Sequence, residues 1–383
     1  MRKEAVDDEN IFIGLKIVEG WENLTIGNQE IAHTNGLILN LRDLTDSNFS
    51  VEVDKASHTI LIGNLAGGYT ASKQQLTLDP TVQESCGTLS SANAEYQMTQ
   101  SLSSTGTCFT VAADNVTLDC AGFSIEYANS TTGYGVSTTG YNTTVIKNCR
   151  FNRVNSIPQN GAAVFFSGTN NSLVFNNTFN ISGNYSFGVS LDLGNRTNVT
   201  SNLINVSGNF SQGIGISKSE FSNVSNNIIN TTNGNNDYGI NLTTSSFNTV
   251  AGNSISTYGK GGSQAWGISV SNVVNNNSVT NNNISTSGVS TNFGIRFTST
   301  INNNNISGNT IRTKGTNANT GISISTTARN NTISNNIIYT SGTSSGNYGI
   351  GLATTMTGNI ISGNFVNTTG TSQNYGIYLT GNT

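Results

Sequence analysis

The segments Phe187–Leu191 (FGVSL) and Trp266–Val270 (WGISV) are two copies of a five-residue unit that decides the fold of this chain. A Gly followed by Val or Ile recurs at Gly135, Gly188, Gly213, Gly239, Gly267, Gly294, Gly321, Gly349 and Gly376. From Gly188 onward the steps are 25, 26, 28, 27, 27, 28 and 27 residues. A period of this size with no helical pattern inside it predicts one structural coil that is stacked repeatedly.

Three short strands are predicted within each repeat. The first carries the Gly unit, and the second centres on Leu173, Val199, Val224, Val250, Val279, Ile306, Ile333 and Ile360. The third follows an asparagine column, which comprises Asn177, Asn202, Asn227, Asn253, Asn282, Asn309, Asn336 and Asn364. Such strands, joined by Asn, Gly and Ser corners, close a triangular coil of about 27 residues. We predict an all-β, right-handed parallel β-helix of roughly ten coils over residues 116–383, since crossovers between parallel strands are right-handed.

Residues 1–80 differ from the repeats, because they hold 12 of the 20 carboxylates and carry a net charge of -6. Alternating patterns between turn signals predict strands at Ile11–Val18, Leu24–Ile31, Leu37–Leu41, Phe49–Val53, His58–Ile62 and Gln75–Leu78. We interpret this region as a small β-sandwich-like N-terminal domain. Residues 81–115 are predicted to cap the first coil, whose hydrophobic face cannot remain open.

The composition narrows the range of partners. Only 9% of the residues are charged, and the 16 Lys and Arg form no cluster, which excludes binding to nucleic acid or to an anionic membrane surface. Regularly spaced Ile and Val argue against disorder. No apolar stretch is long enough to span a membrane, and the segment Met1–Glu9 has four carboxylates and no apolar core, so it is not a secretion signal as written.

Export is predicted from other features of the sequence. The chain contains 21 Asn-X-Ser/Thr triplets, although its composition alone would produce roughly 16 by chance. A surface of Asn, Ser and Thr in place of Lys and Glu is typical of a glycoprotein. We predict an extracellular protein with N-glycan acceptors among Asn23, Asn48, Asn115, Asn129, Asn142, Asn180, Asn184, Asn195, Asn205, Asn209, Asn223, Asn230, Asn241, Asn305 and Asn367.

The four cysteines fit an oxidising compartment. Cys86 and Cys108 precede the repeats, and a bridge between them would close a loop of about 20 residues. Cys120 and Cys149 are 29 residues apart, which is about one coil. Stacked neighbours on adjacent coils lie about 4.8 Å apart, a separation that a disulfide tolerates. The second pair is either such a bridge or two buried free thiols.

Three repeated sets of side chains have a structural interpretation. The asparagine column avoids glycosylation acceptor positions, so we expect an inward amide ladder in which each side chain bonds the neighbouring coils. Residues of the Gly strand such as Gly188, Ser190, Gly213 and Gly215 are expected to form a smooth outward face, the alternative being that Gly only relaxes a corner. Strand parity places the aromatic before each Gly in the core, the alternative being exposed rings that touch carbohydrate. These aromatics are Tyr134, Phe187, Tyr238, Trp266, Phe293, Tyr348 and Tyr375.

The reiterated Asn-X-Ile, Tyr-Gly-Ile and Asn-Asn-X-Ile pattern resembles the right-handed β-helix repeats of the pectate-lyase-like superfamily. It is most similar to the NosD-like and carbohydrate-binding/sugar-hydrolase branch, and Val116–Ile125 (VTLDCAGFSI) resembles the first coil of many members. The resemblance covers about residues 105–383. It implies the fold, whereas activity varies widely among proteins built on this scaffold.

The resemblance also implies what an active member would carry, namely clustered carboxylates, often with calcium, beside Arg, Lys or His. The coils depart from this pattern, because residues 238–383 contain no Asp or Glu and no His follows His58. Asp192 and Glu220 are the nearest approach to a pair, one coil apart but in different columns. The segment Gly342–Gly346 matches a serine-hydrolase motif without a His in the coils to act as base. We therefore expect no enzyme activity, no cofactor and no metal site; isolated His33 is interpreted as an ordinary strand residue.

The sequence finally predicts a structural role. It ends at Thr383 without a closing helix, so either the sequence is truncated or the end assembles head-to-tail or laterally with copies of the same chain. The leading hypothesis is an N-glycosylated cell-surface element: a filament, surface-layer or adhesin subunit. The alternative is a secreted polysaccharide-binding or polysaccharide-processing β-helix protein.

Overall fold

The computed structural model describes residues 80–383 except 154–160, 261–263, 273, 290, 353–354 and 381–383, together with the backbone of the strands before residue 79. It divides into two units, one containing Met1–Val82 with Ala94–Tyr96, and one containing Gln83–Asn93 with Gln97–Thr383. All regular elements of the described residues are strands. No helix in this part of the chain is long and apolar enough to cross a bilayer.

The first unit contains short strands that pair mostly as antiparallel hairpins. β1 pairs with β2, β2 with β6, β6 with β5, β7 with β8, and β8 with β9. The packing that a sandwich requires involves side chains outside the described residues, so the sandwich interpretation stays a prediction. The bounds are β1 (Arg2–Asp7), β2 (Asn10–Leu15), β3 (Leu24–Ile26), β4 (Gln29–Glu30), β5 (Ala32–His33), β6 (Gly36–Asn40), β7 (Phe49–Asp54), β8 (Thr59–Asn64), β9 (Ser72–Gln75), β10 (Thr77–Leu78) and β11 (Thr81–Gln83).

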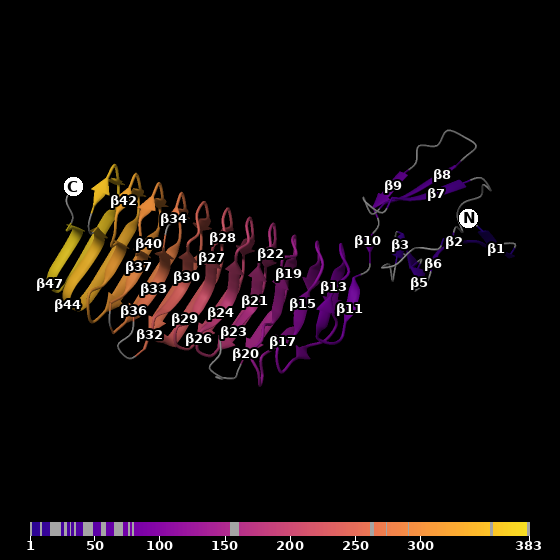
Figure 1. Cartoon of the computed structure of the whole chain (residues 1–383), viewed down its shortest axis with the longest axis horizontal. Helices are drawn as coiled ribbons and strands as arrows, with labels where there is room; N and C mark the ends of the chain where they lie inside the picture. Colours follow the sequence, from indigo (N-terminus) through magenta and orange to yellow (C-terminus); the bar gives the residue numbers. More distant parts are fainter. Residues whose placement is uncertain are drawn as a thin grey trace. The chain divides into compact units, whose positions relative to one another are not determined.

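The second unit is a parallel β-helix with about 27 residues per coil, and its coils follow one another along a single axis (Figure 1). Each coil contributes one strand to each of three faces, as predicted. Face 1 carries the Gly unit. It comprises β12 (Gly87–Leu89), β15 (Phe109–Val111), β18 (Val136–Thr139), β21 (Gly161–Ser167), β24 (Ser186–Asp192), β27 (Gln212–Ser217), β30 (Asp237–Thr243), β33 (Ala265–Ser271), β37 (Phe293–Phe297) and β41 (Thr320–Ile324).

Face 2 forms a separate sheet. It comprises β16 (Thr117–Asp119), β19 (Val145–Lys147), β22 (Leu173–Phe175), β25 (Asn198–Thr200), β28 (Asn223–Ser225), β31 (Thr249–Ala251), β35 (Ser278–Thr280), β39 (Asn305–Ser307), β43 (Thr332–Ser334) and β46 (Ile360–Ser362). A short sheet at the corner between faces 1 and 2 contains β34 (Val274–Asn275), β38 (Ile301–Asn302), β42 (Ala328–Arg329) and β45 (Met356–Thr357).

Face 3 comprises β14 (Leu102–Ser103), β17 (Ser124–Glu126), β20 (Arg150–Arg153), β23 (Thr178–Ser182), β26 (Leu203–Ser207), β29 (Ile228–Gly234), β32 (Ser254–Gly259), β36 (Asn283–Gly288) and β40 (Thr310–Gly315). β44 (Ile337–Leu352) and β47 (Phe365–Leu379) run through face 3 into face 1, and β13 (Glu95–Met98) lies where the two units divide. β12 and β14 already pair in parallel with the next coil, so stacking begins within residues 81–115, the predicted cap.

The core is filled by columns of β-branched side chains. Val189, Ile214, Ile240 and Ile268 follow one another on face 1, and each is fully buried. Equivalent columns on faces 2 and 3 are buried as well, through residues such as Val224. Fully burying one such side chain stabilises the fold by about 1.5–3 kcal/mol, so the repeated Val and Ile account for the stacking.

The Gly of each repeat from Gly135 to Gly349 is buried and faces inward, which corrects the expectation that it belongs to an outward smooth face. A Cβ on Gly267 would lie 2.3 Å from Cγ2 of Ile284 and 2.6 Å from the carbonyl oxygen of Gly294. Ile284 is a buried core residue of face 3. The Gly is therefore required because the interior leaves no room for a methyl group where face 3 approaches face 1.

We expect Gly267→Ala to lower the free energy of unfolding by about 2–3 kcal/mol, as overpacking of a tight core does. Gly87 offers a matched control, since a Cβ there meets no atom within 4 Å, and Gly87→Ala should change stability by less than about 0.5 kcal/mol. Urea unfolding followed by circular dichroism measures both values. Equal effects of the two substitutions would contradict the packing explanation.

The predicted inward amide ladder is confirmed. Asn202, Asn227 and Asn253 are 1–2% exposed, and each amide nitrogen donates to the side-chain oxygen of the next asparagine at 2.9–3.0 Å. The same nitrogens donate to backbone carbonyls of the preceding coil, for example Asn227 to Val199 at 2.8 Å. The ladder therefore satisfies the polar groups of a buried corner over successive coils.

Two further ladders were not predicted. Asn277, Asn304, Asn331 and Asn359 form one at the corner between faces 1 and 2. Asn292, Asn319, Asn347 and Asn374 form another at the corner between faces 3 and 1. Each corner of the later coils is thus held by its own column of buried amides.

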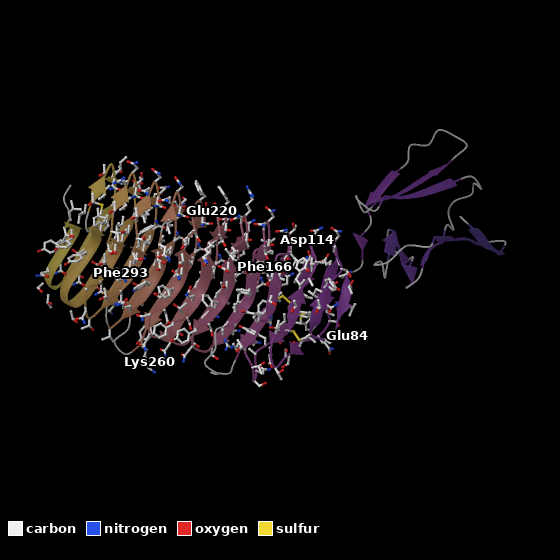
Figure 2. All side chains as sticks on the ribbon, viewed as in Figure 1. Glu84, Asp114, Phe166, Glu220, Lys260 and Phe293 are labelled. Atoms are coloured by element: carbon white, nitrogen blue, oxygen red, sulfur yellow. A yellow bond between two sulfur atoms is a disulfide. The ribbon has the colours of Figure 1, made fainter. Side chains whose placement is uncertain are left out.

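Both disulfide pairings are confirmed. Cys86 bonds Cys108 and Cys120 bonds Cys149, with Cα separations of 4.6 and 4.7 Å. Figure 2 shows the two bonds in the first coils of the β-helix. The Cys120–Cys149 bond joins adjacent coils directly, which excludes the alternative of two free thiols.

Candidate functional site

Six of the seven aromatic residues before the Gly are partly or fully exposed on face 1, so the prediction that they fill the core is wrong for these six. Phe293 is buried, with 9% exposure. On β24 the residues Ser186, Gly188, Val189 and Leu191 are buried, whereas Phe187 is partly exposed. Two successive inward residues interrupt the strict alternation of a strand. The parity argument failed at this interruption, because it counted through the Gly as though the strand were regular.

The small residues of face 1 accommodate these rings. A Cβ on Gly215 would lie 2.9–3.0 Å from ring atoms of Phe187, so the ring occupies the space beside the backbone of the next coil. Tyr348 stacks on Tyr378 with centroids 4.4 Å apart in the last two coils. Outward rings that lie against backbone and against each other form a firm, partly apolar surface.

The middle of this surface is an aromatic cluster around one cation. Trp266 contacts Tyr238 and Phe293 edge to face, with centroids 4.8 and 5.9 Å apart. The guanidinium carbon of Arg296 lies 4.3 Å from the centroid of Trp266 and 4.5 Å from that of Phe293. Tyr238, Trp266, Phe293 and Arg296 come from β30, β33 and β37, and we call them the aromatic cluster.

Burial changes the pKa values of the two ionisable residues of the cluster, Arg296 and Tyr238. Burial lowers the pKa of Arg296 from its ordinary value, and the nearby Tyr238 raises it in part. Burial raises the pKa of Tyr238, with a smaller opposing effect of Arg296. Tyr238 therefore stays a neutral phenol at physiological pH. The cluster offers aromatic surface, a hydroxyl group and guanidinium donors, the kinds of group that bind sugars.

Further aromatic pairs lie on the corners. Phe221 and Phe247 stack with centroids 5.0 Å apart at the corner between faces 1 and 2, and both are nearly half exposed. Both residues have positive φ, at positions where neighbouring coils carry asparagines such as Asn276 and Asn303. Because the two rings cover each other, less of their faces is open than in an isolated ring.

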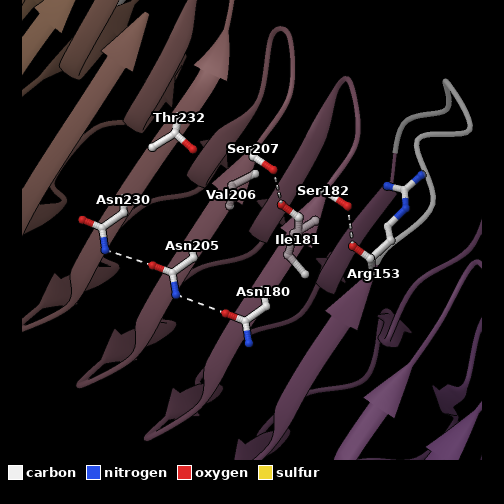
Figure 3. Close-up of a pocket in the computed structure, with 9 residues that line it drawn as sticks. All are labelled: Arg153, Asn180, Ile181, Ser182, Asn205, Val206, Ser207, Asn230 and Thr232. Atoms are coloured by element: carbon white, nitrogen blue, oxygen red, sulfur yellow. Dashed lines mark hydrogen bonds between the residues drawn. The ribbon is translucent and has the colours of Figure 1, made fainter.

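A groove of about 420 Å³ lies on face 3 (Figure 3). Along it the amide nitrogen of Asn205 donates to Asn180 at 3.1 Å, and that of Asn230 donates to Asn205 at 2.9 Å. Asn180 donates in turn to Asn152 at 3.3 Å. This outward amide ladder lines the groove with polar atoms and brings no ionised carboxylate into it.

The burial of the predicted glycan acceptors that the structure describes varies between partly exposed and exposed. None of those among the described residues is buried: Asn115, Asn129, Asn142, Asn180, Asn184, Asn195, Asn205, Asn209, Asn223, Asn230, Asn241, Asn305 and Asn367. Asn23 and Asn48 lie outside the described residues. Glycosylation itself stays a prediction.

The isolated acidic residues do not converge. Asp192 stands opposite Ser217 in the strand register, whereas Glu220 lies in the following turn, where its backbone nitrogen donates to Asn195 Oδ1 at 2.8 Å (Figure 2). Among the described residues no three His, Cys, Asp or Glu side chains gather to hold a metal ion. The backbone of Gly342–Gly346 continues within β44, and His33 lies in β5, while His58 lies outside the described residues.

One acidic residue has an unexpected environment. Asp237 is fully buried at the corner between faces 3 and 1, in the column that continues as the ladder from Asn292. Its carboxylate accepts hydrogen bonds from the backbone nitrogens of Ser211 at 3.2 Å and Gly234 at 2.9 Å. Burial raises the pKa of Asp237 to about 7, although these hydrogen bonds lower it in part. A carboxyl enclosed in this way has no access to a substrate, so its role is to accept the backbone hydrogen bonds of the corner.

Stacked parallel strands on three faces, with a filled interior, define a parallel β-helix protein. Residues 100–255 match the family model described as "Right handed beta helix region", which agrees with this fold. The resemblance to the pectate-lyase-like superfamily is thereby confirmed for the fold. A comparison with curated protein sequences finds no match.

A solved tailspike structure has a similar fold. The tailspike protein gp208 of Dettilon is 16% identical with a TM-score of 0.56, over 77% of this chain and 60% of the tailspike chain. The A-module of a mannuronan C-5 epimerase from Azotobacter vinelandii is 14% identical with a TM-score of 0.41, over 77% and 91% of the two chains. DFA-IIIase from Arthrobacter chlorophenolicus A6 is 14% identical with a TM-score of 0.46, over 73% and 63%. This chain therefore spans about 60% of the tailspike, and these likenesses concern the fold alone.

Proposed function

We propose that this chain is a secreted β-helix protein that binds a polysaccharide along face 1 and does not cleave it. The observation that carries the proposal is the outward aromatic column, and above all the cluster of Tyr238, Trp266, Phe293 and Arg296. Sugar rings have apolar faces that pack on aromatic side chains and hydroxyl groups that bond guanidinium and phenol groups. Aromatic residues in three successive coils, Tyr238, Trp266 and Phe293, suit an extended polymer better than a small ligand.

The arrangement of acids supports binding without cleavage. Glycoside hydrolysis needs two carboxyl groups within about 5–10 Å of each other across the scissile bond. Asp192 and Glu220 occupy different columns, and Asp237 is enclosed in a corner. Two disulfides are typical of a protein that folds in an oxidising compartment, which supports secretion.

Column-matched substitutions test the proposal. Gln212 occupies the same column as Tyr238 and Trp266, so Tyr238→Gln with Trp266→Gln uses a residue that the repeat already accepts. We expect this double variant to lose at least about tenfold in affinity for a neutral polysaccharide selected on a glycan array, since aromatic anchors dominate such interfaces. Isothermal titration measures the change.

The control variant is Phe247→Asn, which removes an exposed ring from a corner and restores the asparagine of neighbouring coils. It should retain affinity within about twofold. A wild-type chain that binds no polysaccharide, or that shortens the bound polymer, would contradict the proposal. Equal losses in the two variants would contradict the assignment to face 1.

A second candidate function is a structural element of the cell surface, such as a filament, surface-layer or adhesin subunit that carries N-glycans and assembles with its own copies. The observation that favours it is the series of buried amide ladders, which makes the β-helix a rigid shaft. Electron microscopy of the purified chain separates the candidates. Fibres or ordered arrays would support the structural role, whereas isolated particles that bind polysaccharide would oppose it.

A further inference from the structure

A second groove of about 400 Å³ lies on face 3 in the later coils. Its walls come from β36, β40, β44 and β47, which pair in parallel in that order. Side chains of Arg312, Lys314 and Tyr339 line it together with polar residues, namely Ser285, Ser287, Ser341, Asn367 and Thr369. The groove is thus separate from the aromatic cluster on face 1.

The charged and aromatic members of this groove depart from the repeat. The column that contains Arg312 and Tyr339 carries Glu126 one coil before Asn152 and otherwise small polar residues, in the order Asn152, Asn180, Asn205, Asn230, Ser256, Ser285 and, after Tyr339, Asn367. The neighbouring outward column carries Ser207, Thr232, Tyr258, Ser287, Lys314, Ser341 and Thr369. The fold therefore accepts Ser or Asn at both sites, and stacking alone does not require Arg312 or Lys314.

The two cations stand together without a local anion. Arg312 and Lys314 are outward residues two positions apart on β40, and both are exposed. Side chains on one face at this spacing are about 7 Å apart along the strand. Residues 238–383 contain five Lys and Arg and no Asp or Glu, so this part of the chain offers no carboxylate to neutralise them.

An aromatic pair borders the cations. The guanidinium carbon of Arg312 lies 5.2 Å from the ring centroid of Tyr339, whose ring lies 5.9 Å from that of Phe365. Tyr339 and Phe365 are 37% and 56% exposed. The stacking holds the planar guanidinium in place, and a guanidinium presents paired donors that match the two oxygens of a carboxylate or sulfate group.

We infer that this groove binds the anionic substituents, carboxylate or sulfate, of an extended polysaccharide. Arg312 and Lys314 contact the anionic groups, the ring of Tyr339 packs on the adjacent sugar, and Asn367 with the Ser and Thr residues bonds its hydroxyl groups. The inference rests on the proposed polysaccharide-binding function and adds a second site of different chemistry to it.

Binding of three polymers by the full-length chain tests the inference. Dextran sulfate supplies sulfate groups, polygalacturonate supplies carboxylates, and unmodified dextran is the neutral reference. We expect the wild type to bind at least one anionic polymer more tightly than dextran. Arg312→Ser with Lys314→Ser should lose at least about tenfold in that affinity, and the difference should shrink at high salt.

The matched control is Arg329→Asn. Arg329 is exposed on the corner between faces 1 and 2, where the preceding coil carries Asn302, so this change also removes a positive charge and restores a repeat residue. It should change affinity by less than about twofold. Preference for one anionic polymer identifies its charged group as the one recognised.

Three outcomes would overturn the inference. The first is that neither anionic polymer binds better than dextran. The second is that the control Arg329→Asn loses as much affinity as the groove variant, which would indicate nonspecific attraction. The third is that light scattering shows low-salt self-association of the wild type that the groove variant loses, because a second copy would then occupy the groove. The variants of Tyr238 and Trp266 report separately on face 1, so failure here does not imply failure there.

Discussion

Substitution of Asn282 by Ala is expected to lower the free energy of unfolding by about 4 kcal/mol. Asn282 is 1% exposed and lies in the middle of the first amide ladder. Its amide nitrogen donates to Val250 O at 2.9 Å and to Asn309 Oδ1 at 3.0 Å, and its oxygen accepts from the backbone and side-chain nitrogens of Asn253. Each such bond contributes about 1 kcal/mol net, and its loss leaves a buried partner unsatisfied.

Urea unfolding monitored by circular dichroism checks this value. The control is Asn283→Ala, one residue later on β36, where the side chain is exposed. Its effect should remain within about 0.5 kcal/mol. A loss below about 1 kcal/mol for Asn282→Ala would show that the ladder contributes little, and the explanation of why this polar sequence folds would then be wrong.

The stability of the chain is expected to fall as the pH rises from 4 to 8, and Asp237→Asn should remove this contribution. The pKa of Asp237 is raised from 3.8 to about 7 in the folded chain, so folding favours the protonated carboxyl. The stabilisation is complete below the unfolded pKa of 3.8 and is lost as the pH rises through about 7. At 1.36 kcal/mol per pKa unit the change amounts to roughly 4 kcal/mol.

The measurement is the free energy of unfolding of both chains at pH 4, 6 and 8. The difference between wild type and Asp237→Asn isolates this residue, because the other titrating groups are common to both chains. We expect the free energy of unfolding of Asp237→Asn to rise relative to that of the wild type by several kcal/mol between pH 4 and pH 8. A pH-independent difference would contradict the burial of an isolated carboxyl at this corner.

The architecture could be predicted because stacking imposes its period directly on the sequence. Each following coil must place a β-branched residue above Val189 and an amide above Asn177. The register between adjacent coils is therefore visible as a nearly constant spacing of these residues in the sequence. The same period made a disulfide between Cys120 and Cys149 feasible, but it left two buried free thiols as the alternative, which the structure excludes. These features depend on which residue lies above which, and a fixed repeat determines that relation.

The orientation of the aromatic residues could not be predicted in this way. Phe187 precedes an inward Gly188 and an inward Val189, and only the three-dimensional approach of Ile204 reveals that Gly188 points into the core. The groove at Arg312 and Lys314 was also missed, since the sequence was searched for paired acids. The sequence does indicate this groove, because Arg312 and Lys314 occupy repeat positions at which other coils mostly carry Asn, Ser or Thr.

The most direct test of polysaccharide binding is a crystal structure of the full-length chain with an oligosaccharide of the polymer selected on the glycan array. We expect an intact sugar chain whose rings pack on Tyr238 and Trp266, across β30 and β33. A sugar bound away from both face 1 and the Arg312 groove, or a cleaved product at a pair of carboxylates, would contradict it.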